Sequence, residues 1–249
     1  MRLASVIWGA LLLCTQAVGA DLRLAVAANF AAPMQLIAEQ FEQQSGHKLS
    51  VSFGSSGKFF AQITHGAPFD VFFSADQAKP HVLVSQQLAL ADSSFTYALG
   101  ALALWSVDKH GVDPNGQVLS GNHFNKLALA NSRLAPYGKA AEQVLQKLGL
   151  LEATRAKWVQ GENIAQTYQF VASQNAQLGF VAQSQIFRQG RLSAGSAWLI
   201  PAEYHDPIRQ DAVILSYCKD PDAARQLLQF MRSAAITELI KSFGYGVEE

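Results

Sequence analysis

The stretch Phe53–Ile63, FGSSGKFFAQI, joins two different hydrophobic patterns through a turn of two glycines and two serines. Before the turn, apolar residues alternate in the β pattern at Leu49, Val51 and Phe53, and after it they recur at helical spacing. A turn of small residues that opens a helix presents free backbone N–H groups, and such groups bind anions. The stretch therefore predicts a strand, an anion-binding turn and a helix.

The turn is not the nucleotide-binding P-loop. That motif places four residues between its first glycine and a Gly-Lys-Ser/Thr triplet, whereas only two residues separate Gly54 from Gly57. Phe59 follows Lys58 where the P-loop has the hydroxyl residue that binds Mg²⁺. The anion-binding interpretation remains and the nucleotide-binding one does not.

The same alternation continues outward from this stretch. Strand patterns at 22–26, 49–53 and 70–74 are separated by helical patterns at 33–41 and 59–63. This order predicts an α/β fold with a mostly parallel, doubly wound sheet and helices on both faces.

The second half of the chain repeats the plan, after a long apolar run at Tyr97–Trp105 that contains Gly100. Further strand patterns lie at 127–130, 178–182 and 212–217, and helical patterns at 141–148, 164–171 and 221–243. No flexible linker separates the halves, so we predict two doubly wound lobes joined by two extended crossover strands. Lobe I is predicted to comprise 21–100 and 212–249, and lobe II 101–211.

The N-terminus has the features of an export signal. Arg2 precedes an apolar run, Leu3–Leu13, that is too short to span a bilayer, and the small residues Val18–Ala20 form a cleavage site. We predict that residues 1–20 are a cleavable signal peptide and that the mature chain is exported. A lipoprotein signal at Cys14 is the alternative, and it is disfavoured because the residue before that cysteine is a leucine.

Charge and cysteine content exclude several classes of protein. Without Arg2 the mature chain has a net charge near −1 and no basic run, so it lacks the electrostatic footprint of a nucleic-acid binder. Cys218 is the one cysteine left after signal cleavage, which excludes an internal disulfide, and its apolar surroundings predict a buried, inert thiol. The six histidines are scattered without metal-ligand spacing.

Ligands of doubly wound sheets bind beyond the carboxyl ends of the strands. Four such places carry small polar or glycine-rich sequence before a helical pattern: 28–30, 54–57, 135–138 and 161–164. Each offers backbone N–H groups at the positive end of a helix dipole. An anion held in this way needs no lysine or arginine.

Six stretches together resemble the periplasmic molybdate-binding proteins of ABC importers, the ModA family, which have the type II periplasmic binding-protein fold. They are VAANFAAPMQLIAEQFE, FGSSGKFFAQI, GAPFDVFFSAD, ANSRLAPYGKAAEQVLQKLG, GENIAQTYQFVASQNAQLGFVAQSQ and DPIRQDAVIL. They cover most of the mature chain in the expected order, although GSSG alone is not specific.

The resemblance implies a binding site for the molybdate oxyanion at Asn29, Ser56, Tyr137 and Ile164, which act as hydrogen-bond donors and not as direct metal ligands. Asn29 is expected to contribute a polar contact after the first strand, and Ser56 a hydroxyl and a backbone N–H. Tyr137 and Ile164 are expected to contribute backbone N–H groups in lobe II. Helix capping by the two serines, Ser55 and Ser56, is the competing interpretation.

The sequence departs from the family pattern at one point. Some members place a tyrosine hydroxyl directly after the strand that ends in LGFV, where this chain has Ala182. We expect Tyr137 to compensate by supplying its hydroxyl as well as its N–H. Lys58 is expected to be a solvated helix residue.

The resemblance implies a monomeric, non-enzymatic periplasmic receptor, without a cofactor, that delivers molybdate and tungstate to the permease and ATPase of an ABC importer. Two alternatives stay open: a receptor for another small oxyanion such as sulphate, and a secreted serine hydrolase with Ser56 as nucleophile. The hydrolase lacks a Gly-x-Ser-x-Gly elbow.

Overall fold

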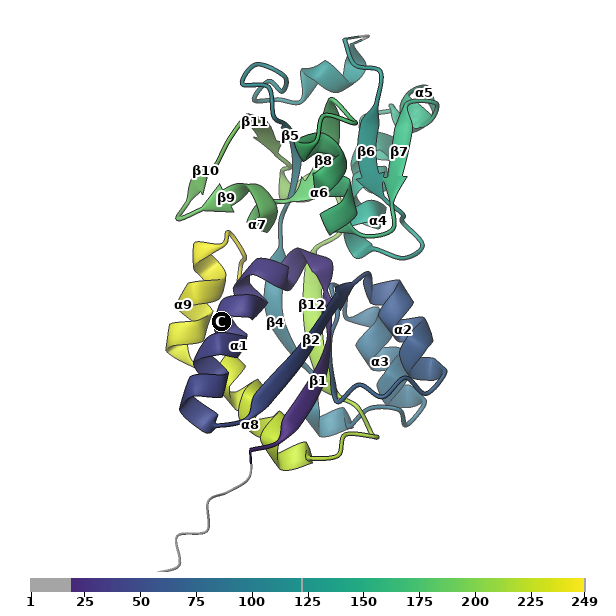
Figure 1. Cartoon of the computed structure of the whole chain (residues 1–249). Helices are drawn as coiled ribbons and strands as arrows, with labels where there is room; N and C mark the ends of the chain where they lie inside the picture. Colours follow the sequence, from purple (N-terminus) through teal and green to yellow (C-terminus); the bar gives the residue numbers. More distant parts are fainter. Residues whose placement is uncertain (1–18, 122, 249) are drawn as a thin grey trace, which may run out of the picture.

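The computed structural model describes residues 19–121 and 123–248 and consists of two α/β lobes stacked end to end (Figure 1). The predicted signal peptide therefore lies, apart from Gly19 and Ala20, outside the described residues. Across the described ranges the helices are too short or too polar to span a lipid bilayer.

The first lobe is built on a five-stranded sheet. Its strand order is β2 (Lys48–Gly54), β1 (Asp21–Ala27), β3 (Val71–Phe73), β12 (Ile208–Ile214) and β4 (Phe95–Gly100). It is covered by α1 (Ala31–Ser45), α2 (Ser56–Thr64), α3 (Ala78–Ser85), α8 (Pro221–Met231) and α9 (Ala234–Ser242). Figure 1 shows α1, α8 and α9 on one side of this sheet and α2 and α3 on the other.

The second lobe has a five-stranded sheet of its own. Its order is β11 (Ser196–Leu199), β5 (Leu102–Ser106), β8 (Leu178–Ala182), β6 (Leu127–Ala130) and β7 (Trp158–Gly161). Its helices are α4 (Pro136–Lys147), α5 (Leu151–Arg155), α6 (Ile164–Ala172) and α7 (Gln183–Ile186), followed by the short ribbon β9 (Phe187–Arg188) and β10 (Arg191–Leu192).

Each sheet combines parallel and antiparallel strands. β1 pairs in parallel with β2 and β3, and β6 with β7 and β8. The antiparallel pairs are β12 with β3 and β4, and β5 with β8 and β11. The sheets are thus less uniformly parallel than the sequence pattern predicts, because β12 in the first sheet and β5 in the second run against the other strands.

The crossovers between the lobes are short. The apolar run Tyr97–Trp105 divides at Gly100 and Ala101 into β4 of the first sheet and β5 of the second. The return strand β12 begins at Ile208, four residues before the predicted start of the second portion of lobe I, and pairs there with Gly100. The polar residues at 209–211 hide this start in the sequence pattern.

The lobes have separate apolar cores, and the inner strands β3, β6 and β8 are buried on both faces, as the continuous apolar run of β3 predicts. Cys218 is half-buried against the core of the first lobe. Burial raises the pKa of its thiol to about 11, so the thiol is protonated at neutral pH, in agreement with the inert role expected for it.

Candidate functional site

A small cavity lies at the junction of the lobes, where loops follow β1, β2 and β3 in one lobe and β6 and β7 in the other. The centre of a water-sized sphere can occupy a volume of ≈ 10 Å³ within this cavity. The residues that line it are Ala27, Ala28, Asn29, Gly54, Ser55, Ser56, Ala75, Ala135, Pro136, Tyr137, Asn163 and Ile164. All four sequence-predicted site residues are in this set, and none of the described residues that line the cavity carries a charge.

The two serines of the turn have different roles. Ser55 is the N-cap of α2, and its Oγ accepts a long hydrogen bond of 3.4 Å from the N–H of Lys58. Ser56 is the first helical residue, and its Oγ accepts the N–H of Ala75 at 2.8 Å. The described residues supply no acceptor for the Ser56 hydroxyl hydrogen, so this buried hydroxyl keeps a donor for a ligand. Capping therefore falls to Ser55.

Three helices begin at the cavity. Ser56 and Ile164 are the first residues of α2 and α6, and Pro136, which has no N–H, makes Tyr137 the first donor of α4. First-turn N–H groups have no acceptor within their own helix. In the described part of the chain, the N–H groups of Ser56, Tyr137 and Ile164 make no bond to another loop or side chain. Three partial positive charges thus converge on one small space.

Asn29 lies in the single turn Ala28–Phe30 (η1) that follows β1, and it is 3% exposed. Its side-chain Nδ2 donates to Oε1 of Gln210 at 2.7 Å and to the hydroxyl of Tyr245 at 3.0 Å. Both amide hydrogens are thereby used within the protein. These bonds leave the backbone N–H of this turn as the group that can face a ligand, and the polar contact expected of Asn29 stays a prediction.

The hydroxyl of Tyr137 lies against the crossover strands. It accepts a hydrogen bond from Nε2 of Gln210 at 3.4 Å, and a Cβ added to Gly100 would lie only 2.2 Å from it. The side chain thus runs from the cavity to the crossover strands and is 1% exposed. Burial, and next the neighbouring hydroxyl of Tyr245, raises the pKa of Tyr137 well above its usual value, so the hydroxyl is neutral. The expectation that it replaces a tyrosine absent at Ala182 is not supported by this position.

Comparisons with known proteins identify the family of the chain. Residues 22–246 match the family model of bacterial extracellular solute-binding proteins. The chain is 51% identical over 240 residues to the molybdate-binding protein ModA of Azotobacter vinelandii, an alignment that covers 96% of this chain and 95% of the relative. The chain belongs to the ModA family.

Two further matches extend the comparison. The molybdate-binding protein ModA of Rhodobacter capsulatus is 42% identical, over 95% of this chain and 92% of its own length. The solved structure of the A. vinelandii periplasmic molybdate-binding protein superposes with a TM-score of 0.89 at 41% identity and covers 92% of this chain and 100% of that one. The predicted type II periplasmic binding-protein fold is confirmed.

Ala182, where the chain departs from the ModA-family pattern, is fully buried and does not line the cavity. Its N–H donates to Oε1 of Gln185 at 2.9 Å, and Nε2 of Gln185 donates to the carbonyl of Ile164 at 3.1 Å. Gln185 therefore connects the end of β8 to the start of α6 and fixes the position of Ile164.

Sequence reasoning missed a buried polar network beneath the cavity. The Tyr245 hydroxyl donates to the carbonyl of Asn29 at 2.7 Å, and the Tyr97 hydroxyl lies 3.1 Å from Oε1 of Gln210. Burial raises the pKa of Tyr245 to about 12 and raises the pKa of Tyr97 well above its usual value. The one sequence signal was Gln210, a polar residue inside an otherwise apolar strand pattern.

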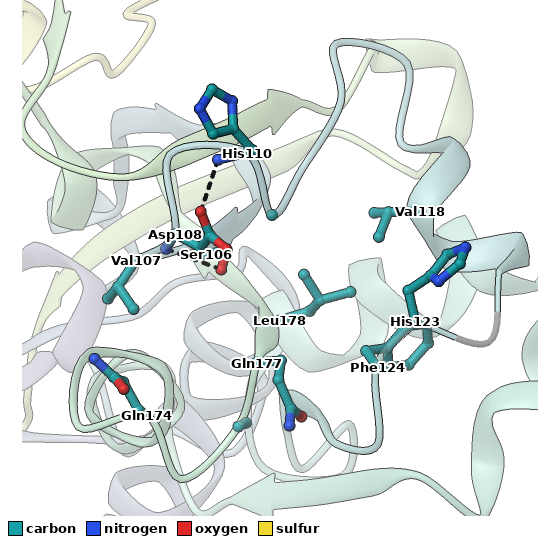
Figure 2. Close-up of a pocket in the computed structure, with 12 residues that line it drawn as sticks. Ser106, Val107, Asp108, His110, Val118, His123, Phe124, Gln174, Gln177 and Leu178 are labelled. Carbon is teal, nitrogen blue, oxygen red and sulfur yellow. Dashed lines mark hydrogen bonds between the residues drawn. The ribbon is translucent and has the colours of Figure 1, made fainter.

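A larger cavity, of ≈ 770 Å³, lies elsewhere, within the second lobe (Figure 2). It contains none of the predicted site residues. Its polar groups bond locally: the carboxylate of Asp108 accepts the N–H of His110 at 2.9 Å, and Oγ of Ser106 accepts the N–H of Asp108 at 3.2 Å. We therefore assign the site to the small cavity between the lobes.

Lys58, expected to be a solvated residue, is more than half exposed, and its Nζ lies 3.4 Å from Oε2 of Glu162 in the other lobe. Neither side chain lines the cavity. An ion pair this exposed contributes little to stability.

Proposed function

We propose that this protein is a periplasmic receptor that binds molybdate, and tungstate in the same way, in the cavity between its lobes. The observation that carries the proposal is the cavity itself. It is small, free of charged side chains and surrounded by three helix N-termini and the Ser56 hydroxyl. The close relatives named for molybdate binding support the choice of anion.

Neutral donors are sufficient to hold a dianion here. Hydrogen bonds to a charged group contribute about 1.5–3 kcal/mol each, so a handful of them with three helix dipoles compensates for the lost hydration shell. We propose that these donors are the N–H groups of Asn29, Ser56, Tyr137 and Ile164 and the hydroxyl of Ser56. A protonated anion would oppose a donor with a donor, which disfavours its binding.

The division of the donors couples binding to closure. Asn29 and Ser56 belong to the first lobe, and Tyr137 and Ile164 to the second. An anion is fully coordinated only when the lobes are together, so its greater affinity for the closed form drives closure. The closed, ligand-bound form is then the one that an importer distinguishes from the open form.

Another small oxyanion such as sulphate is the second candidate. The donors would suit any tetrahedral dianion, so selection rests on cavity size, because a smaller ion leaves some donors without a partner. The close relatives favour molybdate over sulphate.

We infer that the protein is a receptor and not a hydrolase. A serine nucleophile requires a general base within hydrogen-bond reach. Among the described residues that line the cavity there is no histidine and no carboxylate, and Oγ of Ser56 is bonded to the N–H of Ala75. The relatives are named as binding proteins. We propose no resident cofactor, since molybdate is the cargo.

We further propose that the mature chain begins at Asp21, acts as a monomer in the periplasm, and delivers molybdate to the permease and ATPase of an ABC importer. The apolar N-terminal segment with a small-residue cleavage site supports export. Membership of the ModA family supports the proposed delivery of molybdate to an ABC importer.

Calorimetric titration of residues 21–249 with molybdate, tungstate, sulphate and phosphate tests the proposal. We expect heat and a sub-micromolar Kd for molybdate and tungstate, and binding at least about 100-fold weaker for sulphate and phosphate, a difference of about 2.7 kcal/mol. Equal or tighter binding of sulphate or phosphate would refute the molybdate assignment. Labelling of Ser56 by a serine-directed phosphonate would refute the receptor assignment.

A further inference from the structure

The turn that holds Ser56 also carries a contact between the lobes. Gly57, the second residue of α2, donates its N–H to the carbonyl of Leu134 in the second lobe at 2.8 Å. The three consecutive N–H groups at this helix start therefore serve three purposes. That of Ser56 faces the cavity, that of Gly57 binds the other lobe, and that of Lys58 is capped by Ser55.

Gly57 has no room for a side chain. A Cβ added to it would lie 2.8 Å from Cα and 2.9 Å from the carbonyl oxygen of Leu134, and both of these are backbone atoms that cannot rotate away. The backbone of Gly57 itself does not demand glycine, because its φ is not positive. The demand comes from the opposite lobe.

A second interlobe hydrogen bond lies at the other side of the junction in Figure 1, where α7 meets the first lobe. Oγ of Ser184 donates to the carbonyl of Asn29 at 3.0 Å, and both residues are buried. This bond and the bond from Gly57 to Leu134 join the lobes next to the two elements of lobe I that face the cavity, η1 and α2. Neither Gly57, Leu134 nor Ser184 lines the cavity.

We propose that Gly57 is a positioning residue that sets how closely the lobes approach, and that its bond to Leu134 holds the closed form. This inference rests on the proposed function. The donors of the two lobes reach one anion only at this separation, so Gly57 determines affinity without contacting the ligand. When only a fraction of the molecules can close, the apparent affinity for the ligand falls in proportion to that fraction.

Gly57→Ala tests this in residues 21–249. Alanine is a better helix former than glycine, so the ligand-free protein should unfold at the same temperature as wild type or higher. The Kd for molybdate should nevertheless rise at least tenfold, equivalent to about 1.4 kcal/mol. Small-angle X-ray scattering should show that wild type contracts on adding molybdate and that the variant contracts less. A gain in stability combined with a loss of affinity is not expected of a residue needed only for folding.

Two variants serve as controls. Lys58→Gln, on the same helix, removes only the exposed pair with Glu162 and should change the Kd less than about threefold. Ser184→Ala removes the second interlobe bond without adding volume, so it should weaken binding less than Gly57→Ala does.

The outcomes distinguish a failure of the role proposed for Gly57 from a failure of the proposed molybdate-binding function. Wild-type affinity and full contraction in Gly57→Ala, with wild type binding molybdate, would overturn the role of Gly57 alone. A lower unfolding temperature of the ligand-free variant would also overturn it, since the glycine would then be needed within lobe I. Absence of molybdate binding by wild type would overturn the proposed function and with it this inference.

Discussion

Replacement of Ser56 by alanine tests the site most directly. The side chain is 1% exposed, its Oγ accepts the N–H of Ala75 at 2.8 Å, and its hydroxyl hydrogen is left for the anion. Loss of one donor to a charged ligand costs about 1.5–3 kcal/mol, so the Kd for molybdate should rise about 10- to 100-fold.

The same substitution has a second, smaller effect. Ala75 is 2% exposed, and without Ser56 Oγ its N–H loses its acceptor. An unpaired buried N–H costs about 1–3 kcal/mol, and the adjoining cavity should keep the cost near the lower end. Urea unfolding of the ligand-free variant should therefore show a cooperative transition with a free energy of unfolding lower by about 1 kcal/mol.

Ser55→Ala is the matched control, because Ser55 lies in the same turn and borders the same cavity. Its Oγ makes only the 3.4 Å cap to Lys58, so the loss in stability should be at most about 1 kcal/mol and the Kd should change less than about threefold. Calorimetry on the three proteins measures these effects. A wild-type Kd in Ser56→Ala, or an equal loss in Ser55→Ala, would refute the assignment of the Ser56 hydroxyl as an anion donor.

Three further predictions concern the polar network below the cavity. Tyr137→Phe should change the molybdate Kd less than about threefold, because the hydroxyl faces Gln210 and Gly100. A Kd that calorimetry finds raised about tenfold would show that the hydroxyl does contact the anion. Gln210→Leu should lower the free energy of unfolding in urea by about 1–3 kcal/mol, since it leaves the buried amide of Asn29 short of an acceptor, and an unchanged midpoint would contradict this. Burial raises the pKa of Tyr245 to about 12, so the folded protein holds the hydroxyl proton more tightly than the unfolded chain does. The resulting stabilisation of the fold is complete below pH 10 and is lost as the pH rises toward 12. That loss amounts to about 2–3 kcal/mol, and urea unfolding at about pH 9 and about pH 11.5 should show a smaller drop for Tyr245→Phe than for wild type.

Local patterns in the sequence determined the elements around the site. Alternation and helical spacing within a few residues reveal β1, β2, α2, α4 and α6, because each pattern reflects which face of one element is buried. The turn at 54–57 and the loop at 135–138 could be placed at strand ends for the same reason. The position of the cavity then followed from the rule that ligands bind where parallel strands end.

Elements without a clear local pattern were missed. The helix α3 was not predicted, because Pro80 and a weak apolar periodicity mask it. The start of β12 was placed late, because Arg209, Gln210 and Asp211 interrupt the apolar run that otherwise marks a buried strand. The two polar residues Gln210 and Asp211 are nonetheless buried, and their partners, at Asn29 and Thr96, come from distant parts of the chain.

Only the tertiary structure decided which donors remain free for an anion. Whether the amide of Asn29 is available depends on Gln210 and Tyr245, and the bonds from Asn29 to these two residues span 181 and 216 positions of sequence. The close approach of Gly57 to Leu134 likewise joins two lobes that fold around separate cores. A sequence shows which groups can donate a hydrogen bond, whereas the packing of distant segments determines which of them still have a hydrogen to give.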